Sequence, residues 1–183
     1  MNLIQFVGYR KPLRFSSLQV CRELFEALKS GDVNSTKNMF KCTNDSCTAN
    51  YSFFKTPLIY AAGEGRVELV RVLLEEGSYV DRTDPFMNTA LHYAATYGYL
   101  EVCRLLLDWG AKVDPVDTSK ETPLQEAARE GHLSVVKLLV ERGADVRLRN
   151  GDGQTASDMA RGKGKTDVAE WLESVSLDLR LIV

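Results

Sequence analysis

Histidine and cysteine are scarce in this chain, and their scarcity limits the chemistry that it offers. The 183 residues include two histidines and four cysteines. Neither His92 nor His132 has a carboxylate, cysteine or serine at catalytic spacing, so we predict no catalytic site and no enzymatic activity. Cys42 and Cys47 are close enough in sequence to pair or to share a metal ion, and the sequence leaves their pairing open. No further histidine or cysteine lies nearby to complete a zinc site, so we expect neither a metal nor a cofactor.

A strong net charge and long apolar runs are also missing. The formal net charge is −2 at pH 7, which gives no overall attraction to nucleic acid or to an anionic membrane surface. The apolar runs fall far short of a membrane span. The N-terminal segment places apolar residues before basic ones, the reverse of a secretory signal. With cysteines that we interpret as reduced thiols, this predicts a cytoplasmic or nuclear protein whose partner is neither nucleic acid nor membrane.

What the chain has in abundance is a repeat. Segments that begin at Thr56, Thr89, Thr122 and Thr155 follow one another at a constant spacing of 33 residues. The clearest copy is TALHYAATYGYLEVCRLLLDWGAKVD, residues 89–114, and the fourth copy is degenerate. A fixed period of this length is the signature of a stacked repeat protein. We therefore predict an all-α solenoid of helix-turn-helix units, in which neighbouring units share the core.

Turn and capping residues recur in the same phase. Each threonine stands one residue before the first helix of its unit, where its hydroxyl caps an otherwise unpaired N–H group. Glycines end the first helix and the second helix of each unit, where left-handed backbone is wanted. The glycines at these two phases are Gly65, Gly98, Gly131 and Gly164, and Gly77, Gly110 and Gly143. Helices of only about two to three turns are unstable alone, so stacking must supply the stability.

The phase of the repeat divides the chain into segments. We expect an N-terminal extension at 1–17, a repeat domain at 18–174 and a C-terminal tail at 175–183. The repeat domain comprises a degenerate cap at 18–54, full units at about 55–87, 88–120 and 121–153, and a C-terminal cap at 154–174. Residues 174–183, SVSLDLRLIV, alternate apolar and polar side chains, which favours a strand. The final Leu181, Ile182 and Val183 suit capture by a PDZ-type domain; the alternative is a strand or coil that packs on the last helix.

Several motif positions recur in phase across the three full units, in the pattern TPLxxAAxxG followed by VVxLLxxGAxV. This pattern resembles the ankyrin repeat family over roughly residues 20–174. The resemblance implies pairs of antiparallel helices, each followed by a hairpin-like loop, in a curved solenoid. It implies protein binding through the loop tips and the concave face of the first helices. It also implies that His92 and His132 make structural hydrogen bonds between neighbouring loops.

One position departs from the family pattern. The family usually has glycine two residues before the capping threonine. Here Phe54, Met87 and Lys120 occupy that position, and only Gly153 keeps the glycine. Because glycine reaches left-handed backbone without steric cost, the departure predicts that the hairpin tips bend in an unusual way.

The resemblance also assigns candidate partner-binding positions on the tips and on the concave face. The candidates are Phe53, Tyr60, Phe86, Asn88, Tyr93, Tyr97, Trp109, Glu126, Arg129 and Glu130. Aromatic anchors beside charged side chains have the composition of a binding hot spot. The alternative for any single ring is burial against its own loop, because amphipathic aromatic residues are often partly buried.

These observations and the resemblance predict a non-catalytic protein–protein interaction module. We expect a monomer that binds another protein through the concave face and the loop tips, as an adaptor or as a competitive inhibitor. The alternative is a substrate-recruiting or regulatory arm of a larger enzyme or ligase complex.

Overall fold

The computed structural model of the protein describes residues 17–43 and 55–181. These residues form helices in five consecutive pairs, and no strand occurs among them. The pairs are α1 (Ser17–Ser30) with α2 (Val33–Thr43), α3 (Pro57–Gly63) with α4 (Val67–Glu75), α5 (Ala90–Thr96) with α6 (Leu100–Asp108), α7 (Pro123–Glu130) with α8 (Leu133–Glu141), and α9 (Ala156–Gly162) with α10 (Thr166–Leu181). In the described ranges, no helix combines the length and apolarity that a membrane crossing needs. The predicted all-α solenoid is confirmed.

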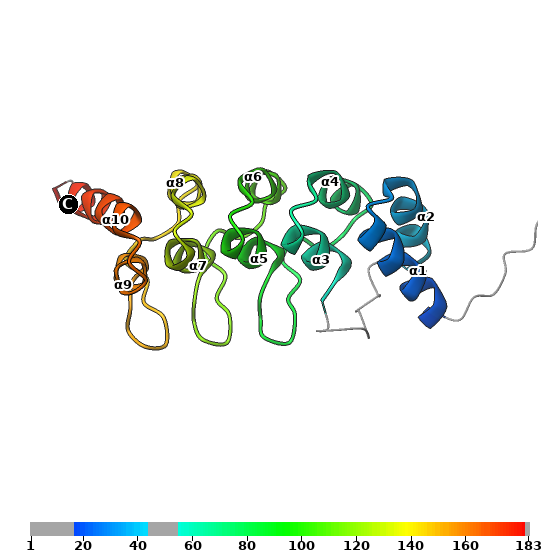
Figure 1. The fold of residues 1–183 in the computed structure, drawn as a ribbon, viewed down its shortest axis with the longest axis horizontal. Helices are drawn as coiled ribbons and strands as arrows, with labels where there is room; N and C mark the ends of the chain where they lie inside the picture. The colour runs from blue at the N-terminus through cyan, green and yellow to red at the C-terminus, as the bar shows by residue number, and fades with distance from the viewer. Residues whose placement is uncertain (1–16, 44–54, 182–183) are drawn as a thin grey trace, which may run out of the picture.

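The helices lie in two rows, as Figure 1 shows. The first helices α3, α5, α7 and α9 form one row, and the second helices α4, α6 and α8 form the other. The loops that lead into α5, α7 and α9 project on the side of the first helices, and their ends are the loop tips. We call the exposed surface of α3, α5 and α7, together with the tips at residues 84–88 and 117–121, the first-helix face.

The predicted threonine caps are present in the structure. The hydroxyl oxygens of Thr56, Thr89, Thr122 and Thr155 each accept the backbone N–H three residues later, at 3.2–3.4 Å. In the last three units the side chain at that third position accepts a hydrogen bond from the threonine N–H, which completes a capping box. These local bonds fix where each first helix begins, and with it the phase of the unit.

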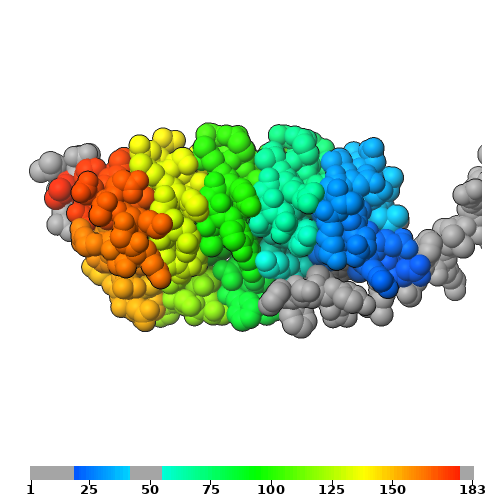
Figure 2. All heavy atoms as spheres, in the orientation of Figure 1, coloured from blue at the N-terminus to red at the C-terminus, as the bar shows by residue number. Residues whose placement is uncertain are grey.

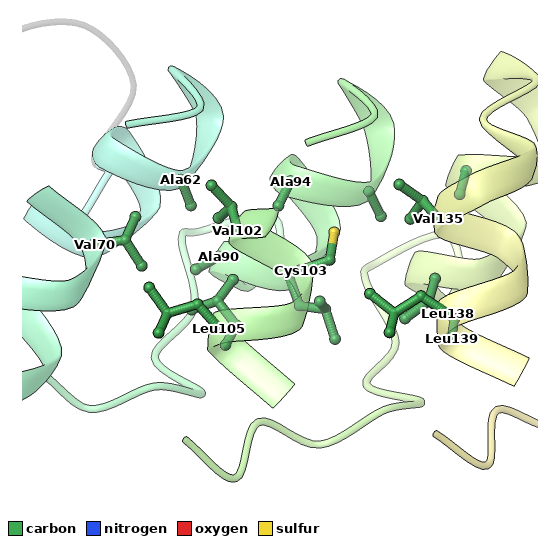
Figure 3. Packing of buried hydrophobic residues seen from close by; sticks show 14 of the residues in the cluster. Ala62, Val70, Ala90, Ala94, Val102, Cys103, Leu105, Val135, Leu138 and Leu139 are labelled. Atoms are coloured by element: carbon green, nitrogen blue, oxygen red, sulfur yellow. The ribbon is translucent and has the colours of Figure 1, made fainter. Parts of the chain in front are cut away.

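Small and branched apolar side chains fill the space between the pairs. The alanine pairs 61/62, 94/95 and 127/128 of α3, α5 and α7 are fully buried, and each of these helices packs against the next. Figure 3 shows this layer, with Ala62 and Ala94 from first helices and Val70, Val102 and Val135 from second helices. Because each helix buries its apolar face against the neighbouring units, helices of seven to nine residues are stable in the array. The units are in continuous contact along the array in Figure 2.

A second stacking contact covers the glycine that ends each first helix. Gly98 has a φ of +75°, and the imidazole of His132 from the next unit lies directly over it. Arg66, Tyr99 and Lys165 occupy the same phase as His132 and cover the glycines of the units before them. The side chain at this phase therefore joins each unit to its predecessor.

The C-terminal end of the array differs from the prediction. Helix α10 begins at Thr166 and continues without a break to Leu181, so the strand predicted for residues 174–183 is wrong over its described part. No glycine or proline occurs between 166 and 181, and extending an existing helix costs less than nucleating a new element. A PDZ-type contact needs an extended peptide, so the end of α10 would have to unwind to make one. Ile182 and Val183 lie outside the described residues.

The thiol prediction is also corrected at one position. Cys103 is a free, buried thiol, and burial raises its pKa to about 12. Cys21 is disulfide-bonded, so the expectation of reduced thiols is wrong for this residue. The side chains of Cys42 and Cys47, whose pairing the sequence leaves open, lie outside the described part of the chain.

Candidate protein-binding site

Each loop tip is built around one polar side chain. In the tip before α5, Asp84 Oδ1 accepts the backbone N–H groups of Phe86 at 2.9 Å and Asn88 at 2.8 Å. Asp117 and Asn150 hold the next two tips in the same way, with oxygen-to-nitrogen distances of 2.8–3.1 Å. Sequence analysis missed these three residues, although their spacing of 33 is visible in the sequence.

These bonds explain how the tips form without glycine. Met87 and Lys120 have φ values of 65° and 60°, in the same left-handed region as Gly153 at 77°. The two tips keep the bend that glycine gives in the third, and the unusual bend predicted for them is not found. Hydrogen bonds also join neighbouring tips. Thr118 donates its N–H to the carbonyl of Phe86 at 3.0 Å, and Gly151 donates its N–H to the carbonyl of Ser119 at 2.8 Å. The tips therefore form a connected and ordered edge.

Two of the candidate aromatic residues, Tyr60 and Tyr93, are half-buried and brace the fold. Tyr60 packs edge-on against Phe25, with ring centroids 5.9 Å apart. Tyr93 donates its hydroxyl to Asp84 Oδ2 at 2.9 Å, and Lys55 Nζ lies 3.9 Å from the centroid of the Tyr93 ring. Burial and the hydrogen bond that Tyr93 donates to Asp84 raise the pKa of Tyr93, so the phenol stays protonated. For these two rings, packing against the protein itself accounts for much of their surface.

Three other candidate aromatic residues remain exposed. Phe86 is 56% exposed in the tip that leads into α5, and Tyr97 is 54% exposed at the C-terminal end of the same helix. Trp109 is 45% exposed at the end of α6, in the row of second helices. Asn88 is half-buried within the tip, and Phe53 lies outside the described residues. The structure thus places Phe86 and Tyr97 at the two ends of one first helix, and Trp109 on a different row.

The candidate charged residues of α7 are bound to one another. Arg129 Nη1 lies 2.7 Å from Glu121 Oε2, and its Nε lies 3.3 Å from Glu130 Oε1. Its Nη2 pairs with Glu126 Oε2, which also accepts the hydroxyl of Thr96 at 3.2 Å. Glu126 is 7% exposed, and burial raises its pKa against the opposing effect of Arg129. Each nitrogen group of Arg129 therefore already faces a carboxylate, while Glu130 stays exposed.

An acidic cluster lies beside this group. Asp117, Glu121 and Glu126 each place one carboxylate oxygen within 4.8 Å of the others, a geometry that hard cations bind. The protein uses these carboxylates itself: Asp117 accepts two backbone N–H groups of its tip, and Arg129 contacts both glutamates. These bonds account for the cluster, and we assign it a structural role that joins the tip before α7 to that helix.

Both histidines connect neighbouring units, as the resemblance implied. His92 Nδ1 accepts the N–H of Thr89 at 3.1 Å, and its Nε2 lies 3.2 Å from the carbonyl oxygen of Glu121. A neutral ring protonated on Nε2 satisfies both bonds, and burial lowers the pKa of His92 and so favours that neutral form. His132 Nε2 lies 3.0 Å from the carbonyl oxygen of Thr96 in the preceding unit. Both histidines therefore hold neighbouring units together.

Comparison with models of protein families agrees with this architecture. A model described as ankyrin repeats (3 copies) matches residues 24–117, and a model described as ankyrin repeat matches residues 119–151. Together the matches cover more than half of the chain and include α2 to α8 in full. Ankyrin repeats are a protein–protein interaction fold and not a catalytic one. The chain therefore belongs to the ankyrin repeat family, and its array is a protein-interaction module.

Proposed function

We propose that the protein binds a partner protein across the first-helix face, as an adaptor or as a competitive inhibitor that masks a surface of the partner. The exposure of Phe86 and Tyr97 at the two ends of α5, in the middle of the array, carries this proposal. Stacking and capping account for the buried residues of the unit, but more than half of each of these two residues stays open to solvent. Exposed aromatic residues near the centre of a surface are typical binding hot spots.

The backbone that carries the two rings is held in place before any partner arrives. Two N–H groups of the tip bind Asp84, and the Phe86 carbonyl accepts the N–H of Thr118 from the next tip. At the other end of α5, the Tyr97 N–H donates to the carbonyl of Tyr93 at 3.1 Å. A surface ordered in advance loses less conformational entropy on binding. This order supports a role as a rigid binding platform.

Affinity purification with the full chain tests the proposal. We expect proteins retained by the unaltered chain to be lost with the Phe86→Ala/Tyr97→Ala double variant, because both hot-spot rings are removed. Trp109→Ala is the matched control, since Trp109 is an exposed aromatic residue at the end of α6, in the row of second helices and outside the first-helix face. Thermal unfolding of all three proteins should agree closely, because exposed side chains contribute little to stability. Full retention of the partners by the double variant would contradict the proposal.

An adaptor and an inhibitor differ in their effect on the partner. A competitive inhibitor lowers the activity of the partner in proportion to occupancy and displaces a third protein from the same surface. An adaptor leaves that activity unchanged and holds two proteins at once. Titration of the captured partner with the purified chain distinguishes the two roles.

A further inference from the structure

Four equivalent positions lie at the C-terminal ends of the first helices. They are separated by the repeat period and carry Glu64, Tyr97, Glu130 and Lys163. All four residues are exposed. Because the first helices stack in order along one row (Figure 1), Tyr97 has an exposed glutamate one unit away on either side. An open tyrosine ring therefore lies between two carboxylates along the row.

The charges around Tyr97 are mainly negative. The guanidinium of Arg129 already contacts three carboxylates, so this group as a whole keeps an excess of negative charge. Within the described residues, Glu64 forms no ion pair within 4 Å. Lys55 lies over the ring of Tyr93 and interacts electrostatically with both Asp84 and Glu64, so it offsets part of their negative charge. The first-helix face of α3, α5 and α7 thus favours a positively charged partner surface over an acidic one.

The ring and the carboxylates favour the same kind of ligand. An arginine or lysine side chain binds favourably over the face of an aromatic ring, and neighbouring carboxylates add to that attraction. Phe86 and Met87 provide an exposed apolar surface in the tip that leads into α5. That tip projects beyond the row of first helices (Figure 1), so a partner that covers both Tyr97 and this surface runs from the end of α5 along the loop. An extended peptide has that reach.

We propose that the partner presents an extended basic segment to the first-helix face. Its arginine or lysine covers Tyr97 between Glu64 and Glu130, and an apolar side chain farther along the segment packs on Phe86 and Met87. This inference rests on the proposed function and specifies the chemistry of the partner.

Selection from a phage-displayed library of random peptides on the full chain tests this inference. We expect the enriched peptides to carry arginine or lysine together with an apolar residue. A synthetic peptide with the enriched sequence should bind less tightly after its arginine or lysine is replaced by glutamine, and less tightly at high salt. Fluorescence polarisation gives each dissociation constant.

Charge reversal on the protein provides the matched comparison. Glu64→Lys/Glu130→Lys should weaken binding roughly fivefold for each reversed charge, or about 25-fold together. Glu75→Lys/Glu141→Lys changes the net charge equally, in the same two units, but on the exposed side of α4 and α8. That control variant should bind within about twofold of the unaltered chain, because its charges lie on the other row.

The outcomes separate this inference from the proposed function. Enrichment of acidic or uncharged peptides that bind less tightly to Phe86→Ala would refute the basic charge of the partner segment. The same result would still support binding at the first-helix face. Equal weakening by the two charge-reversed variants would also overturn it, since attraction by net charge would then suffice. Peptides that bind Phe86→Ala/Tyr97→Ala as tightly as the unaltered chain would count against the face itself. A library that yields no enriched peptide would overturn a linear segment as the partner.

Discussion

Replacement of Gly98 by alanine tests the stacking contact between units most directly. Gly98 has a φ of +75°, and an added Cβ would lie 2.5 Å from Nδ1 and 2.7 Å from Cε1 of His132. The ring cannot move away freely, because its Nε2 is bonded to the carbonyl of Thr96 at 3.0 Å. The substitution therefore combines backbone strain with a collision against the neighbouring unit.

The two costs can be given separate magnitudes. Left-handed backbone costs an alanine about 1–2 kcal/mol, and the stiffer unfolded chain offsets about 0.4–1 kcal/mol of that, which leaves roughly 1 kcal/mol. Displacing the His132 ring loses one hydrogen bond, about 1 kcal/mol, and forces an unfavourable rotamer, about 1 kcal/mol. We expect Gly98→Ala to lower the free energy of unfolding by roughly 3 kcal/mol in all.

Gly110→Ala isolates the backbone cost. Gly110 lies in the same unit with a φ of +82°, and nothing lies within 4 Å of its added Cβ. This variant should lose only about 1 kcal/mol. Urea unfolding followed by circular dichroism gives the free energy of unfolding of both variants. The two values are compared with the same slope of free energy against urea concentration.

A double-mutant cycle with His132→Ala then isolates the collision. Once the imidazole is absent, Gly98→Ala should cost only about 1 kcal/mol, as Gly110→Ala does. Equal destabilisation by Gly98→Ala and Gly110→Ala in the unaltered background would refute the stacking contact, as would an undiminished cost of Gly98→Ala in the His132→Ala background.

Two further predictions concern the tip and the capping residues. Asp84→Ala removes the acceptor of two tip N–H groups and of the Tyr93 hydroxyl, and should cost roughly 2–3 kcal/mol in urea unfolding. Asp84→Asn should cost under about 1 kcal/mol, because Asn150 performs the same role in its own tip; an equal loss for both variants would contradict this role. The folded-state pKa of His92 is lowered by burial, so its contribution to stability is present above its unfolded pKa of about 6.5 and is lost as pH falls below that value. The melting temperature should fall less between pH 8 and pH 5 in His92→Gln than in the unaltered chain. Glutamine is chosen because Gln125 completes the capping box at the equivalent position. An unchanged pH profile would rule His92 out as the cause.

The repeat itself was predictable because its chemistry is local. The threonine cap and the glycine that ends each helix act within a few residues of the chain, and the alanine pair recurs in the same phase, so the spacing of 33 predicts the helices and their order. The polar residue that holds each tip, at Asp84, Asp117 and Asn150, obeys the same period and was missed only because a polar residue in a loop looks like any other exposed polar residue. The tail from 174 to 181 was mispredicted for a related reason. Its alternation matches a strand, but a helix already in progress extends more readily than a new element forms.

The binding face depended on contacts between side chains, which the period does not describe. Tyr93 and Tyr97 are four residues apart and both were candidates, yet Tyr93 bonds to Asp84 and Tyr97 stays open. Arg129 was a candidate as an accessible charge, but three carboxylates surround it, one of them from the preceding loop. The family, the units and the stacking positions could be predicted from the sequence, because caps and turns act locally and the buried positions recur with the period. Which rings and charges remain available to a partner could not be predicted, because exposure and pairing depend on the side chains that the folded chain brings together.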